Sequence, residues 1–125
     1  MTKNETPRIK FDELGLNESV LHAIHDLKFE YPSDIQQKAI PVVLEGFDII
    51  GQAQTGTGKT LAFGAPILSR MEKGNGKIQA IIMSPTRELA VQVAEELQRI
   101  AKHERIKILT ISTPLFKAEI CLSID

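Results

Sequence analysis

The chain has 125 residues, a length that supports one domain with a hydrophobic core. Apolar residues make up 42% of the sequence, charged residues 25%, and the net charge is -1. The net charge therefore gives no indication of nucleic-acid binding. Contact with nucleic acid would require a local basic patch on the surface. The single cysteine, Cys121, excludes an internal disulfide, and no paired-cysteine metal motif is present.

The first residues are polar and lack the apolar core of a signal peptide. No apolar run approaches the ~18 residues of a membrane span. We therefore expect a soluble, cytoplasmic protein without a membrane partner. Residues 1–10 are predicted to be disordered. A helix is predicted over residues 17–29, with Asn17 as its N-cap. Its apolar residues recur at helical spacing, and they are Val20, Leu21, Ile24 and Leu27.

A second helix is predicted to begin at Ser33, and Gln36 follows three residues later, as in a capping box. Pro41 is expected to interrupt or bend this helix. The stretch "FDIIGQA", residues 47–53, has the apolar character of a short buried strand.

Strands and helices then alternate along the chain. We predict a helix over 61–70, a surface loop over 72–77 and a strand over "IQAIIMS", residues 78–84. An amphipathic helix over 85–103 and a strand over 106–112 follow. This alternation favours an α/β fold with a parallel sheet and flanking helices.

The stretch "AQTGTGKT" is typical of a P-loop, which cradles phosphates with backbone N–H groups. Gly56 and Gly58 permit the sharp turns, Lys59 can reach the β- and γ-phosphates, and the Thr60 hydroxyl can ligate Mg²⁺. The alternative is a plain glycine-rich turn between a strand and a helix. The predicted nucleotide ligands in this stretch are Ala53, which stands where the usual pattern has glycine, Gln54, Thr55, Gly56, Thr57, Gly58, Lys59 and Thr60.

Two further segments indicate which kind of nucleotide-binding protein this is. "KFEYPSDIQ", residues 28–36, together with Phe11, resembles the Q motif of DEAD-box RNA helicases. "PTRELAVQ", residues 85–92, resembles their motif Ia, and "AQTGTGKT" is similar to their motif I. The three motifs occur in the family's order. The chain is therefore identified as similar to the N-terminal part of the first RecA-like domain of that family.

The resemblance implies that Gln36 reads adenine, that Phe29 packs against the base and that Phe11 buttresses the motif. A glutamine amide offers donors and an acceptor that match the N6 amino group and N7 of adenine. The alternative role for Gln36 is the capping box with Ser33. Position 28 is lysine where the family usually has glycine, which is expected to alter the local turn.

By the same resemblance, Pro85, Thr86 and Arg87 contact the RNA backbone. A hydroxyl, a guanidinium and the free N–H groups of a helix N-terminus together suit a phosphate. The alternative is that Ser84 or Thr86 caps the helix while Arg87 pairs with a nearby acid.

The resemblance implies a P-loop NTPase fold over residues 11–112, incomplete in this sequence, and a parallel RecA-like sheet. Lys59 and Thr60 would carry the catalytic roles, with ATP and Mg²⁺ as cofactors. The sequence lacks the Asp-Glu-Ala-Asp tetrad that the family uses for hydrolysis, so we expect nucleotide and RNA binding without turnover. The alternative is a non-catalytic nucleotide-binding, RNA-binding or interaction fragment. The oligomeric state is left open.

Residues 113–125 carry no motif and stay unassigned. A foreign tail is the first interpretation, and a short Walker B strand over "ICLSID" with Asp125 as a Mg²⁺ partner is the second. His22, His25 and His103 are scattered without ligand spacing, so they are interpreted as surface residues rather than metal ligands.

Overall fold

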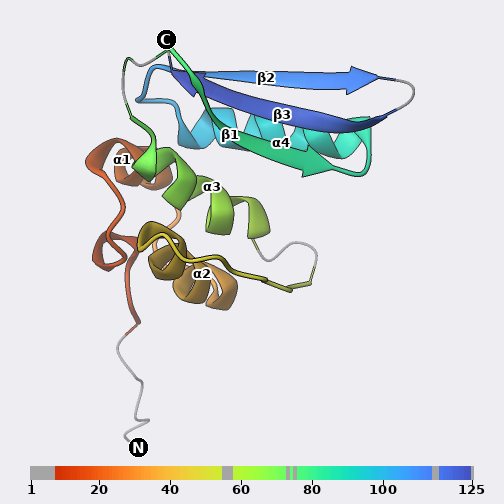
Figure 1. Cartoon of the computed structure of the whole chain (residues 1–125). Helices are drawn as coiled ribbons and strands as arrows, with labels where there is room; N and C mark the ends of the chain where they lie inside the picture. Colours follow the sequence, from red (N-terminus) through yellow and green to blue (C-terminus); the bar gives the residue numbers. More distant parts are fainter. Residues whose placement is uncertain (1–7, 55–57, 73, 75, 114–115, 125) are drawn as a thin grey trace, which may run out of the picture.

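The computed structural model describes residues 8–54, 58–72, 74, 76–113 and 116–124. Figure 1 shows a sheet at one end of the molecule, with α4 against one of its faces and α3, then α2, stacked beyond α4. A helical turn and four helices are described: η1 (Phe11–Glu13), α1 (Glu18–Asp26), α2 (Asp34–Leu44), α3 (Lys59–Arg70) and α4 (Arg87–Ile100). The described strands are β1 (Ile78–Ser84), β2 (Ile106–Thr113) and β3 (Phe116–Ile124).

Local capping sets where α1 and α4 begin. The Asn17 side chain accepts a hydrogen bond from the Val20 N–H at 2.9 Å, as predicted. The Thr86 hydroxyl accepts one from the Leu89 N–H at 3.1 Å. Each such cap typically contributes ~1 kcal/mol to helix stability. In α2 the helix continues to Leu44, so Pro41 does not interrupt it.

The core forms where the helices meet the inner face of the sheet. Gly64 of α3 lies close to α4, because a Cβ at this position would lie 2.5 Å from Leu97 Cδ2. A larger residue would therefore force the two helices apart or displace the leucine. Every helical element contributes a fully buried side chain to this core, namely Phe11, Ile24, Ile40, Leu68 and Leu97.

The expected parallel pairing of the strands is wrong, although the α/β alternation is confirmed. The described sheet has the order β1-β3-β2, and β3 pairs antiparallel with both neighbours. β1 and β2 therefore run in the same direction with β3 between them (Figure 1). The reason is local: only two residues separate β2 from β3, a connection that permits an antiparallel hairpin but not a parallel crossover.

The strand predicted over residues 47–53 is also wrong, because residues 47–54 lie outside any helix or strand. The Ile50 side chain is 99% exposed and the Phe47 side chain 64% exposed. A buried strand needs hydrogen-bonding partners for its backbone on neighbouring strands. Here β1 takes its partner from β3, which lies in the segment without a motif, and no described strand pairs with residues 47–53.

The outer face of the sheet carries exposed apolar side chains on its two outer strands, β1 and β2. Along β1, Ala80 and Ile82 pack against the core, while the alternate Ile81 and Met83 are 60% and 66% exposed. The register places Ile81 and Leu109 opposite the same residue of β3, so β2 continues this surface. We call it the open face, and its members are Ile81, Met83, Leu109 and Ile111.

Among the described residues, no helix combines the length and apolar character needed to cross a membrane.

Candidate functional site

Gln36 joins the beginnings of two helices. It lies in the first turn of α2 and is 7% exposed. Its Oε1 accepts a hydrogen bond from the Ser33 N–H at 2.8 Å, which completes the predicted capping box. Its Nε2 donates to the Gly58 carbonyl at 3.2 Å, directly before α3. The adenine-reading residue predicted from the sequence is thus held against the end of the predicted phosphate loop.

Gly58 begins α3 in a conformation that favours glycine. Its φ of 80° is in the left-handed region, and a Cβ there would overlap the Gln36 amide. No side chain within the described residues caps α3, unlike α1, α2 and α4. The exposed Lys59 and the half-buried Thr60 follow in the first turn. Uncapped N–H groups beside a lysine and a hydroxyl suit a phosphate anion.

The remaining residues of the predicted loop are only partly described. Ala53 is half-buried and Gln54 is exposed, and neither lies in a helix or strand. Thr55, Gly56 and Thr57 lie outside the described residues, so their predicted role as a phosphate cradle stays a prediction.

The two aromatic residues of the Q motif have different environments. Phe11 is 1% exposed and belongs to the core, whereas Phe29 is 50% exposed. Phe29 follows α1 in a Schellman turn, in which its N–H donates to the Ile24 carbonyl and the Lys28 N–H donates to the His25 carbonyl. Lys28 has a φ of 62°, the conformation that glycine adopts most easily. The unusual lysine therefore occupies a left-handed turn.

Pro85, Thr86 and Arg87, predicted to contact RNA, are all exposed where β1 leads into α4, and Arg87 is the first residue of that helix. The capping alternative is confirmed for Thr86, which also accepts a hydrogen bond at its carbonyl from the Ser84 hydroxyl at 3.4 Å. Capping leaves the Arg87 side chain on the surface. Figure 1 shows that α3 and α4 begin on the same side of the molecule, so both helix N-termini face that side.

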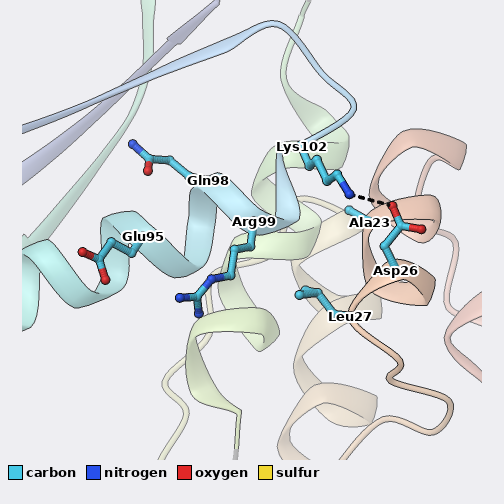
Figure 2. Close-up of a pocket in the computed structure, with 7 residues that line it drawn as sticks. All are labelled: Ala23, Asp26, Leu27, Glu95, Gln98, Arg99 and Lys102. Carbon is cyan, nitrogen blue, oxygen red and sulfur yellow. Dashed lines mark hydrogen bonds and ion pairs between the residues drawn. The ribbon is translucent and has the colours of Figure 1, made fainter.

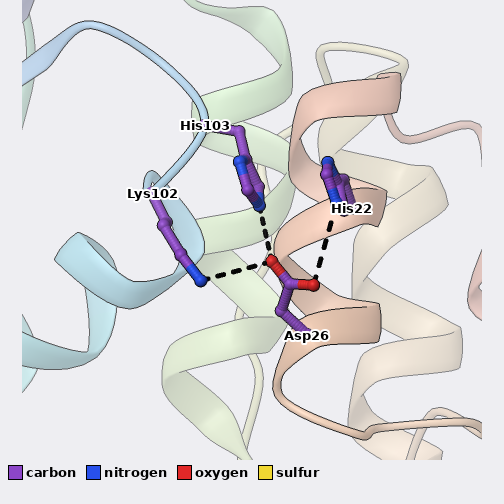
Figure 3. A network of polar contacts seen from close by, with 4 residues as sticks. All are labelled: His22, Asp26, Lys102 and His103. Carbon is purple, nitrogen blue, oxygen red and sulfur yellow. Dashed lines mark hydrogen bonds and ion pairs between the residues drawn. The ribbon is translucent and has the colours of Figure 1, made fainter.

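A second polar cluster joins α1 to the turn after α4, and sequence reasoning missed it. Figure 3 shows His22, Asp26, Lys102 and His103 converging. Asp26 Oδ2 lies 2.6 Å from His103 Nε2 and 3.4 Å from Lys102 Nζ, and Asp26 Oδ1 lies 3.7 Å from His22 Nε2. The hydrogen bond with His103 lowers the pKa of Asp26, with further lowering from Lys102 and His22.

The interpretation of the histidines as scattered is therefore wrong for two of them. The rings of His22 and His103 stack with centroids 3.8 Å apart, although both residues are at the surface, as predicted. His22 and Asp26 are four residues apart on a predicted helix, and this spacing was the only signal in the sequence. Nothing local could have linked them to His103, which is brought near by the packing of α1 against α4.

An open cleft of about 530 Å³ lies beside this cluster, between α1 and α4 (Figure 2). Asp26 and Lys102 belong to both the cleft and the cluster. None of the described residues predicted to bind nucleotide or RNA lines it. The other residues that line the cleft are Ala23, Leu27, Glu95, Gln98 and Arg99.

Comparison with known proteins identifies the family. The sequence pattern of the DEAD/DEAH box helicases matches residues 33–119. The chain is 53% identical over 103 residues to the ATP-dependent RNA helicase CshA of Limosilactobacillus reuteri. The matched segment covers 82% of this chain and 21% of that protein. The chain thus spans about a fifth of the length of the curated relatives it matches.

Two solved structures are similar in fold. A DEAD box protein from the hyperthermophile Methanococcus jannaschii matches with a TM-score of 0.68 and 47% identity, over 73% of this chain and 25% of that one. Dbp5 of S. cerevisiae, bound to RNA and ADP BeF3, matches with a TM-score of 0.73 and 42% identity, over 76% of this chain and 25% of that one. The RecA-like α/β fold and the family resemblance are confirmed, and the chain belongs to the DEAD/DEAH box helicase family.

Proposed function

We propose that this chain is the adenine-nucleotide- and RNA-binding N-terminal part of a DEAD-box ATP-dependent RNA helicase. The observation that carries the proposal is the hydrogen bond from Gln36 Nε2 to the Gly58 carbonyl. It couples the residue that would read the base to the start of the helix that would bind the phosphates. The RNA and ADP BeF3 bound by the similar Dbp5 structure support both ligand classes.

The Gln36 amide retains the groups that adenine requires. Its oxygen uses one lone pair on the Ser33 N–H, and its nitrogen uses one hydrogen on the Gly58 carbonyl. An amide oxygen has a second lone pair, and the nitrogen has a second hydrogen. That pair would accept from the adenine N6 amino group and donate to N7, whereas guanine offers an acceptor in place of the amino group. Phe29 would supply the apolar contact to the base.

The beginning of α3 would bind the phosphates. Lys59 would approach the β- and γ-phosphates, and the Thr60 hydroxyl would hold Mg²⁺, which screens phosphate charge. The uncapped helix N-terminus fits this role, because a bound phosphate would accept from N–H groups that no described side chain caps.

The exposed stretch Pro85–Arg87 would contact RNA phosphates rather than bases. Contacts of this kind are blind to base sequence and weaken as salt concentration rises. These 125 residues contain no Asp-Glu-Ala-Asp tetrad to help hold Mg²⁺ and orient the attacking water. We therefore propose binding without turnover for this stretch alone.

The test is a titration of the chain with a fluorescent ADP analogue in the presence of Mg²⁺, with ADP and GDP as competitors. Lys59→Ala and Gln36→Glu should each weaken binding at least ~10-fold, the equivalent of one lost hydrogen bond to a charged or buried partner. Gln36→Glu is the sharper variant, because glutamate preserves the capping box and removes the amide donor. ADP should compete better than GDP in the wild type.

The absence of a strand over residues 47–53 favours one alternative, a non-catalytic interaction fragment. Residues 47–54, which lead toward α3, pair with no described strand. Equal competition by ADP and GDP, or binding unaffected by Lys59→Ala, would favour this alternative over the proposed nucleotide site.

A further inference from the structure

We propose that His22, Asp26 and His103 form a site for Zn²⁺ or a chemically similar divalent transition-metal ion, which ties α1 to the turn after α4. The site is separate from the residues proposed to bind nucleotide and RNA. It uses two imidazole nitrogens and one carboxylate, a donor set that zinc accepts in proteins.

The donor atoms are close enough to share one ion. One ligand atom from each of the three residues lies within 4.8 Å of the others. In a tetrahedral zinc site with bonds near 2.0–2.1 Å, neighbouring ligand atoms are about 3.3 Å apart. His22 Nε2 lies 3.7 Å from Asp26 Oδ1 and His103 Nε2 lies 2.6 Å from Asp26 Oδ2, so the two imidazoles approach different oxygens of the same carboxylate. Side-chain rotations would bring one atom from each residue to the spacing of a tetrahedral site.

The scaffold around these side chains is already held in place. His22 and Asp26 are one helical turn apart on the same face of α1. The turn that carries His103 is anchored to the start of α1, because Asn17 Nδ2 donates to Glu104 Oε1 at 2.8 Å. An ion would therefore bind without ordering the backbone, which favours affinity.

The two rings have to turn before they can share an ion. Their planes are within 4° of parallel, so nitrogen lone pairs that lie in those planes do not converge on one centre. The His22 side chain is 63% exposed, so turning its ring disrupts little packing, whereas the His103 side chain is 27% exposed and loses part of its packing when its ring turns. With three protein ligands, the fourth position of a tetrahedral ion would hold water.

One neighbouring charge opposes the ion. Lys102 Nζ lies 3.4 Å from Asp26 Oδ2, and the ammonium group would repel a bound cation and compete for the carboxylate. Removing the charge of Lys102 should tighten metal binding. Tighter binding would show that the ion lies at Asp26 rather than elsewhere on the chain.

The experiment is a calorimetric titration of Zn²⁺ into the untagged full chain after treatment with a chelator, repeated with Co²⁺ to record the absorption of a tetrahedral site. His25→Ala is the matched control, because His25 lies on the same helix and also contacts a carboxylate, Asp12 Oδ1, at 3.0 Å. We expect one saturable site. His22→Ala and His103→Ala should each weaken it at least ~10-fold, while His25→Ala leaves it unchanged and Lys102→Gln tightens it.

Circular dichroism confirms that each variant is folded, and His22→Gln and His103→Gln replace any alanine variant that is not. A rise in the melting temperature of the wild type with Zn²⁺, absent in the two ligand variants, would add support. The absence of saturable binding by the wild type would overturn the proposal. Equal weakening by His25→Ala, or weaker binding after Lys102→Gln, would do the same and leave the cluster as an ion pair only.

Discussion

At the scale of single residues, the backbone conformation of Lys28 explains why the family usually has glycine at this position. The turn after α1 places position 28 at a φ of 62°, where an L-residue with a Cβ is disfavoured by ~1–2 kcal/mol. In the sequence, position 28 stands out because the motif it resembles usually has glycine there. The positive φ of Lys28 is known only from the structure.

We predict that Lys28→Gly raises the free energy of unfolding by about 0.5–1 kcal/mol, since relief of left-handed strain exceeds the added freedom of the unfolded chain. Urea denaturation measures the change. The matched control is Lys38→Gly, in the interior of α2, which should lower stability by about 1 kcal/mol. A destabilising Lys28→Gly would show that the lysine side chain makes a compensating contact.

Gln36 illustrates a residue whose two possible roles do not exclude each other. The sequence offered adenine recognition and helix capping as alternatives. The capping box is formed, yet it occupies only part of the hydrogen-bonding capacity of the amide. The contact with Gly58 was not predictable, because it joins residues 22 positions apart through the packing of α2 on α3.

At the scale of elements, the close approach of α3 and α4 rests on Gly64. We predict that Gly64→Ala lowers the free energy of unfolding by about 1 kcal/mol. An overpacking cost of ~1–3 kcal/mol against Leu97 exceeds the gain of ~1 kcal/mol in helix propensity. Chemical denaturation provides the measurement.

Leu97→Val supplies the second arm of this test. If the cost of the new methyl group comes from Leu97 Cδ2, the penalty of Gly64→Ala should shrink in the Leu97→Val background. A stabilising Gly64→Ala would mean that the leucine moves aside at little cost and that helix propensity decides the sign.

The elements also show where sequence reasoning stopped. The helices and two strands followed from the sequence pattern, so α1, α2, α3, α4, β1 and β2 lie near their predicted ranges. The strand predicted over residues 47–53 failed because periodicity reports apolar character and not the presence of a partner strand. The strand considered over "ICLSID" overlaps β3, and the alternation of apolar residues at 116, 118, 120, 122 and 124 was a signal for the whole strand that the search for motifs passed over.

At the scale of the whole molecule, the open face leaves apolar side chains in contact with solvent. We predict that Ile81→Lys and Met83→Lys each reduce self-association and reduce the binding of an apolar dye to the open face. Both side chains lie on this face. Their effect on the free energy of unfolding should stay below about 1 kcal/mol. Fluorescence of an apolar dye and sedimentation velocity measure the two effects.

Ile82→Lys is the control on the neighbouring residue, whose side chain packs toward the core. It should destabilise the fold strongly, because it would bury an unpaired charge. Equal tolerance of lysine at positions 81 and 82 would contradict the assignment of the two faces.

The central position of β3 has a consequence for the order in which the chain can fold during synthesis. β1 and β2 leave the ribosome first, but every described strand-to-strand hydrogen bond of the sheet requires β3. The helices can therefore collapse early on local contacts, while both outer strands wait unpaired. Formation of the sheet has to wait for β3, which pairs with β2 along one edge and with β1 along the other.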